Sequence, residues 1–145
     1  MTLFKISNGK TVGVFFNNKK TPTKKKIEIF LISDRFIEAR FDEIRIPKGF
    51  EIIDTSIDYS RIKNGELEHI SRVTIPDGIR TISSCAFMRT GITEVVIPAS
   101  VKVIGQWAFA SCHNLKKVTF MGVPDEIGMG AFADCPNLVE TVSQT

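Results

Sequence analysis

VTIPDGIRTISSCAFMRTGIT (73–93), VVIPASVKVIGQWAFASCHNLKK (95–117) and VTFMGVPDEIGMGAFADCPNLVE (118–140) are the three stretches that decide the fold. When they are aligned, apolar side chains recur in the same phase at a period of 22 to 23 residues. The aligned positions are Val73/Val95/Val118, Ile75/Ile97/Phe120, Ile82/Ile104/Ile127 and Phe87/Phe109/Phe132. A fixed period of this length is typical of proteins that stack one small structural unit on the next.

A more diverged copy of the same unit precedes these three. It keeps the apolar phase but is longer, because about seven residues are inserted after its second apolar segment. Its matching residues are Ile44, Ile46, Pro47, Phe50 and Ile53. The sequence therefore predicts one repeat region over 44–145, made of a degenerate repeat (44–72) and three clear repeats (73–94, 95–117 and 118–140).

A single repeat cannot fold alone. Burying its six inward apolar side chains gains roughly 10–15 kcal/mol, at about 1.5–3 kcal/mol each. Ordering some 22 residues costs on the order of 1–2 kcal/mol per residue. Stacked neighbours supply the missing burial and the strand hydrogen bonds, so we predict a solenoid with parallel strands, a short helical turn at each Ala-Phe pair, and a need for caps at its open ends.

The composition agrees with one β-rich domain. Nineteen isoleucines against five leucines, with eleven phenylalanines, favour extended backbone. A chain of 145 residues, 43% hydrophobic and 24% charged, lies within the range of globular domains and outside that of disordered ones. No apolar run approaches the ~20 residues that span a bilayer, and the start lacks a secretory signal. We therefore expect a cytoplasmic protein, unless the chain is a fragment of a surface protein.

The repeats resemble the bacterial BspA-type leucine-rich repeats, with an Ile-Pro strand end, an Ile-Gly step, an Ala-Phe pair and a Cys-x-x-Leu turn. The matching segments are Ile75-Pro76, Ile97-Pro98, Ile104-Gly105, Ile127-Gly128, Ala86-Phe87, Ala108-Phe109, Ala131-Phe132, Cys112–Leu115 and Cys135–Leu138. The first clear copy departs from the pattern, with Ser83 at the glycine step and Met88-Arg89-Thr90-Gly91-Ile92 in place of the Cys-x-x-Leu turn, and Phe120-Met121 replaces Ile-Pro in the last. The resemblance implies a leucine-rich-repeat solenoid that serves as a surface or host-interaction scaffold.

Residues 1–43 do not repeat. Leu3–Ile6 and Thr11–Phe16 flank Asn8-Gly9, a strong hairpin signal, and Ile27–Ile32 and Phe36–Phe41 are predicted to be further strands. We interpret this segment as an N-terminal β cap on the first coil. A separate ligand-binding β module is the alternative.

The positive charge of the chain also lies in this segment, which holds nine Lys or Arg against five Asp or Glu. A lysine-rich loop over 17–26 contains Lys19, Lys20, Lys24, Lys25 and Lys26. Neither an arginine cluster nor interleaved aromatic residues accompany it, and the net charge of the whole chain is only +3. Nucleic acid is therefore disfavoured as a partner.

The sequence contains no signature of catalysis, metal binding or cofactor binding: HExxH, GxSxG, a P-loop and a Rossmann glycine motif are missing. Cys85, Cys112 and Cys135 are an odd number without an export signal, which predicts reduced thiols. Cys112 and Cys135 share one repeat phase and are expected to form a buried thiol column. With only His113 nearby, four tetrahedral zinc ligands are not assembled. We expect no enzyme, no metal and no cofactor.

The outward face of the strands is the surface predicted to bind a partner, because alternate strand residues point out together. One outward column alternates in charge along Glu43, Arg72, Glu94, Lys117 and Glu140. The neighbouring column is mildly apolar, and Trp107 is a further candidate anchor because lone exposed tryptophans often dominate interfaces. The candidate binding residues are Arg72, Thr74, Glu94, Val96, Lys117, Thr119, Met121 and Trp107.

The predicted function is that of a non-catalytic protein-binding or adhesion module whose partner is another protein. An alternative is an intracellular inhibitor or regulatory subunit that docks on one enzyme or complex through the same face. A third interpretation is a fragment of a larger surface protein. Because no polar capping segment follows Glu140, the edge of the last coil is also a candidate surface for self-association.

Overall fold

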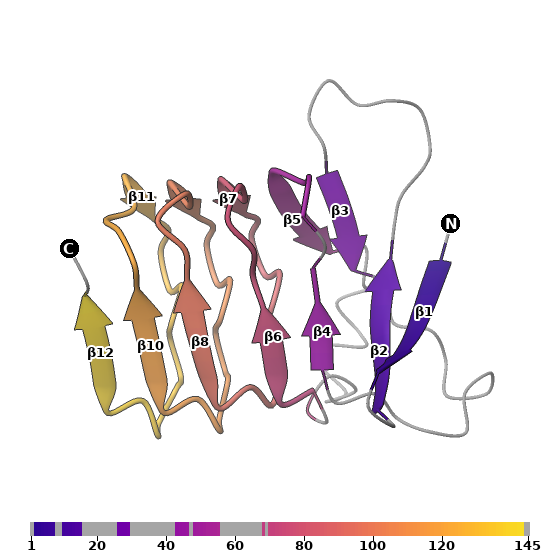
Figure 1. Cartoon of the computed structure of the whole chain (residues 1–145). Coiled ribbons are helices and arrows are strands. Elements are labelled where there is room, and N and C mark those ends of the chain that lie inside the picture. Colours follow the sequence, from indigo (N-terminus) through magenta and orange to yellow (C-terminus); the bar gives the residue numbers. More distant parts are fainter. Residues whose placement is uncertain are drawn as a thin grey trace.

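The structure, a computed structural model, describes residues 2–7, 10–15, 26–29, 43–46, 48–55, 68 and 70–143. Its strands are β1 (Thr2–Ser7), β2 (Lys10–Phe15), β3 (Lys26–Ile29), β4 (Glu43–Arg45), β5 (Ile52–Thr55), β6 (Arg72–Thr74), β7 (Thr81–Ile82), β8 (Glu94–Ile97), β9 (Val103–Ile104), β10 (Lys117–Phe120), β11 (Glu126–Ile127) and β12 (Glu140–Ser143). They form the stacked coils of a solenoid (Figure 1), which confirms the predicted fold class.

Each coil contributes one strand to each of two sheets. The larger sheet has the order β1-β2-β4-β6-β8-β10-β12, and the smaller one has the order β11-β9-β7-β5-β3. Neighbouring repeat strands are parallel and in register, for example Val95 beside Val118 and Ile82 beside Ile104. The degenerate copy follows the same register, because Ile44 lies beside Val73 and Ile53 beside Ile82.

The third side of each coil is a wall of stacked turns over 83–90, 105–112 and 128–135. Within this wall, the backbone N–H groups alternate between two acceptors. One N–H donates to the carbonyl three residues back in its own coil, and the following one donates to a carbonyl of the next coil. Ala86 N–H donates to Ser83 O at 3.2 Å, whereas Phe87 N–H donates to Ala108 O at 2.7 Å. Half of the backbone hydrogen bonds of this wall therefore join neighbouring coils, instead of all running along one helix axis.

The predicted short helical or 3-10 turn at each Ala-Phe pair is present as single turns closed by bonds three residues back, and these turns do not extend into a helix in the described residues. Two positions in each coil adopt a left-handed conformation, which interrupts any helix. They are Cys85, Trp107 and Gly130 at the first position (φ 60 to 66°) and Arg89, Ser111 and Asp134 at the second (φ 54 to 57°).

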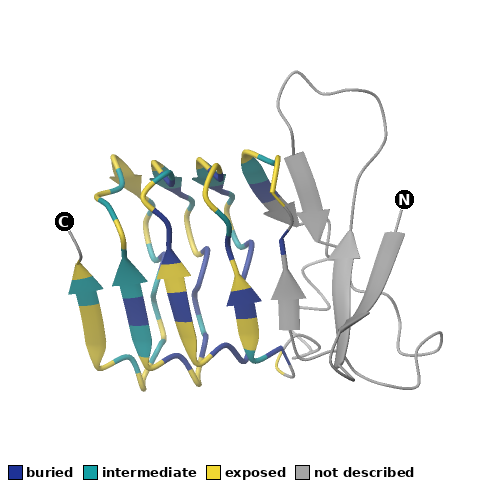
Figure 2. Cartoon of the chain, in the orientation of Figure 1, coloured by how far each residue is buried: buried dark blue, intermediate teal, exposed yellow. Residues whose placement is uncertain are grey.

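The core consists of columns of equivalent side chains that run through the stacked coils. The six inward residues of the first clear repeat are all buried, as predicted: Val73, Ile75, Ile79, Ile82, Phe87 and Ile92. Phe87 and Phe109 stack at 5.3 Å between ring centroids, and Phe109 and Phe132 stack at 5.2 Å. Figure 2 shows buried and exposed residues alternating along β8, with the buried ones facing this core.

Glycine follows isoleucine at this repeat position because the backbones of neighbouring coils approach each other too closely for a side chain. A Cβ added to Gly105 would lie 2.7 Å from the carbonyl carbon of Ser83, and one added to Gly128 would lie 2.8 Å from that of Gly105. The departure at Ser83 leaves the local hydrogen bond intact, because Ser83 N–H donates to Ile53 O at 2.9 Å just as Gly105 N–H donates to Ile82 O at 2.7 Å.

Strands of the N-terminal region extend both sheets. The hairpin predicted around Asn8-Gly9 is confirmed, since β1 and β2 pair antiparallel with Ser7 opposite Lys10. β2 then lies parallel to β4 in the larger sheet, and β3 lies parallel to β5 in the smaller one. The strand predicted over Phe36–Phe41 lies outside the described residues, and whether this region caps the core remains a prediction.

The stack of phenylalanine rings allows a test of the way in which the coils are aligned. Phe109→Ala removes a fully buried ring that lies between two others, so it should lower the free energy of unfolding by about 3–5 kcal/mol. Phe132→Ala should cost less, because this ring is only partly buried against the core. Urea denaturation measures both. Equal losses, or a near-wild-type Phe109→Ala, would contradict the proposed packing.

Candidate functional site

The outward charged column of the larger sheet is in register along its full length. Strand pairing places Glu43 beside Arg72, Arg72 beside Glu94, Glu94 beside Lys117 and Lys117 beside Glu140. Lys117 Nζ lies 3.5 Å from Glu140 Oε1. Partly exposed pairs of this kind contribute about 0–1 kcal/mol, so the column adds fixed charges of alternating sign more than it adds stability.

The second outward column is milder in character. Thr119 pairs with Val96, and Arg45 pairs with Thr74. Val96 is 52% exposed and Met121, just beyond the end of β10, is 42% exposed. Hence this part of the face offers apolar side chains beside the charged column.

A shallow groove of about 470 Å³ opens on the strand face between β6 and β8. It brings together four of the predicted binding residues, Arg72, Thr74, Glu94 and Val96, and it is also lined by Val73, Ile75 and Thr93. At its walls, Val73 and Ile75 are 9% and 8% exposed, whereas the equivalent Val95 and Ile97 are 2% and 1% exposed. The groove therefore reaches the edge of the hydrophobic core.

The strands beside the groove are less fully paired than their neighbours. β6 and β8 pair only at Arg72 and Glu94, whereas β8 and β10 pair from Lys117 through Phe120. At the end of β10, Met121 N–H also donates to Ile97 O at 2.9 Å and holds β10 against β8. The equivalent residue after β8 is Pro98, which has no N–H to donate toward β6, so this last bond is missing between β6 and β8.

Trp107 lies away from this face, on the turn wall. Its side chain is 40% exposed, as expected for an anchor, but its backbone is left-handed (φ 60°). A Cβ added at Gly130, the equivalent residue of the next coil, would overlap the Trp107 ring. Cys, Trp and Gly can all occupy this repeat position partly because it is exposed, and partly because the Trp107 ring packs over the equivalent glycine of the next coil.

The predicted thiol column is present but only partly buried. Cys112 is fully buried, and its thiol donates to Phe87 O at 3.3 Å, whereas Cys135 is partly exposed and donates to Phe109 O at 3.2 Å. The expectation that both are buried is wrong for Cys135, because no described coil covers the last one. Thr90 is the aligned residue of the first clear repeat, but its hydroxyl donates to Phe87 O of its own coil at 3.0 Å, whereas each cysteine donates to a carbonyl of the preceding coil.

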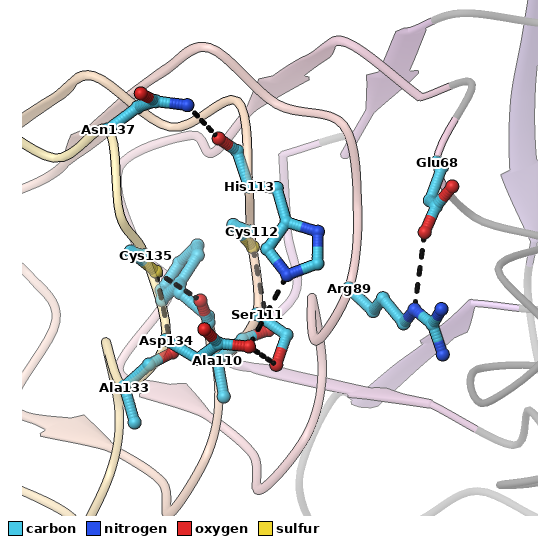
Figure 3. Close-up of polar contacts among 11 residues, drawn as sticks. Glu68, Arg89, Ala110, Ser111, Cys112, His113, Ala133, Asp134, Cys135 and Asn137 are labelled. Carbon is cyan, nitrogen blue, oxygen red and sulfur yellow. Dashed lines mark hydrogen bonds and ion pairs between the residues drawn. The ribbon is translucent and has the colours of Figure 1, made fainter.

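A polar cluster lies beside these thiols on the turn wall (Figure 3). The Asp134 carboxylate accepts a hydrogen bond from Ser111 Oγ at 3.0 Å and lies 3.3 Å from His113 Nε2. These contacts, the histidine first and the serine second, lower the pKa of Asp134. The coil carrying Asp134 is tied back further by Asn137, whose Nδ2 donates to His113 O at 2.6 Å.

This cluster does not assemble a metal centre. Within the described part of the chain, no three His, Cys, Asp or Glu side chains are grouped as a metal ion requires. The lysines at 19, 20, 24 and 25 lie outside the described residues, so the interpretation of that loop stays a prediction. Among the residues placed by the structure, no helix is long and apolar enough to cross a membrane.

The C-terminal end of the solenoid exposes positions that are core positions elsewhere. Ile127 is 50% exposed, whereas the equivalent Ile82 and Ile104 are fully buried. Leu138 is only partly buried, unlike the equivalent Leu115. Hence the open face of this coil is both apolar and bordered by the last strands of the two sheets, β12 and β11.

Sequence reasoning missed the groove and the role of Thr90. The groove depends on how far β6 and β8 pair, which the repeat pattern does not predict. Thr90 could have been recognised from its alignment with Cys112 and Cys135, because a hydroxyl, like a thiol, can donate to a buried carbonyl.

Comparisons with known proteins agree with this geometry. The sequence profile of the BspA type leucine rich repeat region, six copies long, matches residues 30–144, and so begins 14 residues before the predicted repeat region. No curated protein sequence matches the chain.

Solved structures share the fold. A leucine-rich repeat protein from Bacteroides ovatus superposes with a TM-score of 0.59 at 21% identity, over 72% of this chain and 26% of that one. The T. pallidum leucine rich repeat protein superposes with a TM-score of 0.56 at 20% identity, over 98% of this chain and 82% of that one. The pneumococcal vaccine antigen PcpA superposes with a TM-score of 0.54 at 16% identity, over 97% of this chain and 44% of that one. The chain thus spans about a quarter of the Bacteroides protein and under half of PcpA.

The cover of Gly130 by Trp107 can be tested by fluorescence, since Trp107 is the single tryptophan of the chain. Gly130→Ala places a methyl group where the ring lies, so the indole should move into solvent and its emission should shift to longer wavelength. Gly78→Ala is the control, because it also adds a methyl group at a glycine of positive φ, but no atom of Trp107 lies within 4 Å of the added Cβ. Unchanged emission in Gly130→Ala would refute the contact.

Proposed function

The chain belongs to the BspA-type leucine-rich repeat family, and from this premise we propose that it is a non-catalytic protein-binding or adhesion module. Its contact surface is the strand face of the larger sheet, centred on the groove between β6 and β8. The observation that carries this proposal is that four of the eight residues chosen from sequence line that groove together.

Rigidity of the strand face supports this assignment. Its side chains are fixed at a regular pitch by in-register strands, so little conformational entropy is lost when a partner binds. The turn wall also offers exposed residues. Its polar side chains, however, are engaged with one another, as in the contacts of Asp134 with Ser111 and His113.

The chemistry of the groove indicates what kind of partner segment fits. Val73 and Ile75 provide apolar contact at its walls, while Arg72 and Glu94 lie in register at one end. An extended segment that inserts an aliphatic or aromatic side chain and carries charges of both signs beside it would match this surface. Burial of such a side chain in a desolvated pocket is the usual source of binding energy at protein interfaces.

Two biological forms of this function use the same surface. In the adhesion form, which the BspA-type family of the repeats supports, the partner lies outside the cell. In the alternative form the chain is an inhibitor or regulatory subunit that docks on an enzyme or complex of its own cell. A photo-crosslinking residue placed at Val96, followed by mass spectrometry of the crosslinked protein, identifies the partner and distinguishes the two forms.

Substitution on the strand face tests the proposal. Val96→Glu should weaken partner binding by at least about 30-fold, the effect of losing a hot-spot contact of roughly 2 kcal/mol. Charge reversal at Arg72 or Lys117 should weaken it in the same direction. Val123→Glu is the matched control, since Val123 is 65% exposed and lies outside the groove. Binding is measured by interferometry with the crosslinked partner, after circular dichroism shows that each variant is folded.

Replacing Lys24, Lys25 and Lys26 by Ser should mainly reduce the association rate and its salt dependence. If this triple variant abolished binding while Val96→Glu retained it, the strand-face proposal would be wrong and the N-terminal region would contain the site.

Self-association through the C-terminal face is the second candidate function, because Ile127 occupies a core position yet is half exposed. An edge strand with unpaired backbone groups beside apolar surface is a common site for joining a second chain. The occupant proposed here is a second copy that meets the first C-terminal face to C-terminal face, with β12 beside β12.

Ile127→Glu should therefore convert a concentration-dependent dimer into a monomer in sedimentation velocity, because a charge would be buried at the contact. Val96→Glu is its control and should leave the dimer intact. A wild-type chain that stays monomeric throughout the micromolar range would rule out this candidate.

A further inference from the structure

The two thiols of the turn wall have no part in the proposed binding surface, yet they lie in equivalent places on adjacent coils. Cys112 donates to Phe87 O and Cys135 donates to Phe109 O, so each thiol repeats the contact of the other one coil along. Figure 3 places both beside the Ser111–His113–Asp134 cluster. We propose that Cys112 and Cys135 form an oxidation site, at which a low-molecular-weight disulfide of the glutathione type produces a disulfide bond between the two coils.

Backbone spacing supports this pairing. Backbone hydrogen bonds between the coils bracket the two cysteines: Ser111 N–H donates to Ala133 O at 2.8 Å on one side, and Val139 N–H donates to Lys116 O at 3.2 Å on the other. Chains bonded in this way lie about 4.7–4.9 Å apart. Disulfides join Cα atoms separated by about 4.4–6.8 Å, so the bond needs only local side-chain adjustment.

The column contains only one such pair among the described repeats. Its third member, in the first clear repeat, is Thr90, whose Oγ1 lies 3.5 Å from Cys112 Sγ. Cys85 belongs to another column, beside Trp107 and Gly130 in the repeat alignment. Hence Cys112 can be oxidised toward Cys135 alone.

The two thiols differ in access and in acidity, which assigns their order of reaction. Cys135 is partly exposed, whereas Cys112 is fully buried. When Cys135 is ionised, the Cys112 thiol can donate its single proton to that thiolate in place of Phe87 O, which lowers the pKa of Cys135 to about 7, while burial and Asp134 act in the opposite direction and His113 assists. The same bond, followed by burial, raises the pKa of Cys112. Since the thiolate is the attacking species, Cys135 is the nucleophile and Cys112 the resolving thiol.

The reaction balances in two thiol–disulfide exchanges. The Cys135 thiolate attacks one sulfur of glutathione disulfide, which forms a Cys135–glutathione bond and releases one glutathione thiolate. Cys112 then loses its proton and attacks the Cys135 sulfur, which forms the Cys112–Cys135 bond and releases the second glutathione. Two electrons pass from the protein thiols to glutathione disulfide, which is reduced to two glutathione molecules.

The experiment treats the native protein with glutathione disulfide, blocks the remaining thiols and analyses the tryptic peptides by mass spectrometry. Each cysteine lies in its own peptide: Cys85 in 81–89, Cys112 in 103–116 and Cys135 in 118–145. We expect peptides 103–116 and 118–145 to be linked in the wild type and equally in the control Cys85→Ser, whose mutated thiol has a pKa raised by burial.

Threonine variants identify the steps without emptying the site, because Thr90 already occupies the equivalent place. Cys112→Thr should stop at the Cys135–glutathione adduct, and Cys135→Thr should leave Cys112 unmodified in the native protein. The adduct should form in the wild type with a pH dependence that has its midpoint near 7. Cys112→Val, which has no donor, should move that midpoint upward toward the ordinary cysteine value of about 8.5.

Three results would each overturn the inference: oxidation that links Cys85 to either other cysteine, an adduct on Cys112 in Cys135→Thr, or a folded wild-type protein that gains no link between 103–116 and 118–145. Circular dichroism of each variant before oxidation establishes that the folded chain is compared throughout.

Discussion

Backbone hydrogen bonding between adjacent coils is the constraint on which the rest of this structure depends. It operates on all three sides of the coil: two sheets of parallel strands and a wall of turns whose alternate N–H groups bond across to the next coil. Because the spacing is fixed, equivalent side chains must stack directly on one another. The ring stack of Phe87, Phe109 and Phe132, the glycine step at Gly105 and the charged column through Arg72 and Glu94 all follow from that one requirement.

The most informative places for function are those where stacking is interrupted. β6 and β8 pair only at Arg72 and Glu94, and between them the strand face opens into a groove lined in part by the core residues Val73 and Ile75. At the C-terminal end the last coil leaves Ile127 half exposed. Both interruptions expose apolar surface next to fixed polar groups, which is the arrangement that a protein partner or a second copy can cover.

The turn wall has a different chemistry from the strand face. Its left-handed positions carry Arg89, Ser111 and Asp134, and polar contacts there run from coil to coil. Thiol–carbonyl bonds line its inner side, with Cys135 accessible and Cys112 behind it. Adjacent coils can therefore carry the proposed recognition surface and a thiol pair on separate sides, since each side repeats its own residue types at the same 22 to 23 residue period.

The sequence by itself determined the solenoid, its inward residues and the register of the charged column, because a repeat with one period must place equivalent residues on equivalent positions. It also located the hairpin at Asn8-Gly9 through turn chemistry. It misjudged the burial of Cys135, and it did not predict that alternate N–H groups of the Ala-Phe turns bond to the neighbouring coil. Only the tertiary structure decided the groove between β6 and β8 and the cover of Gly130 by Trp107, since both depend on what the adjacent coil supplies.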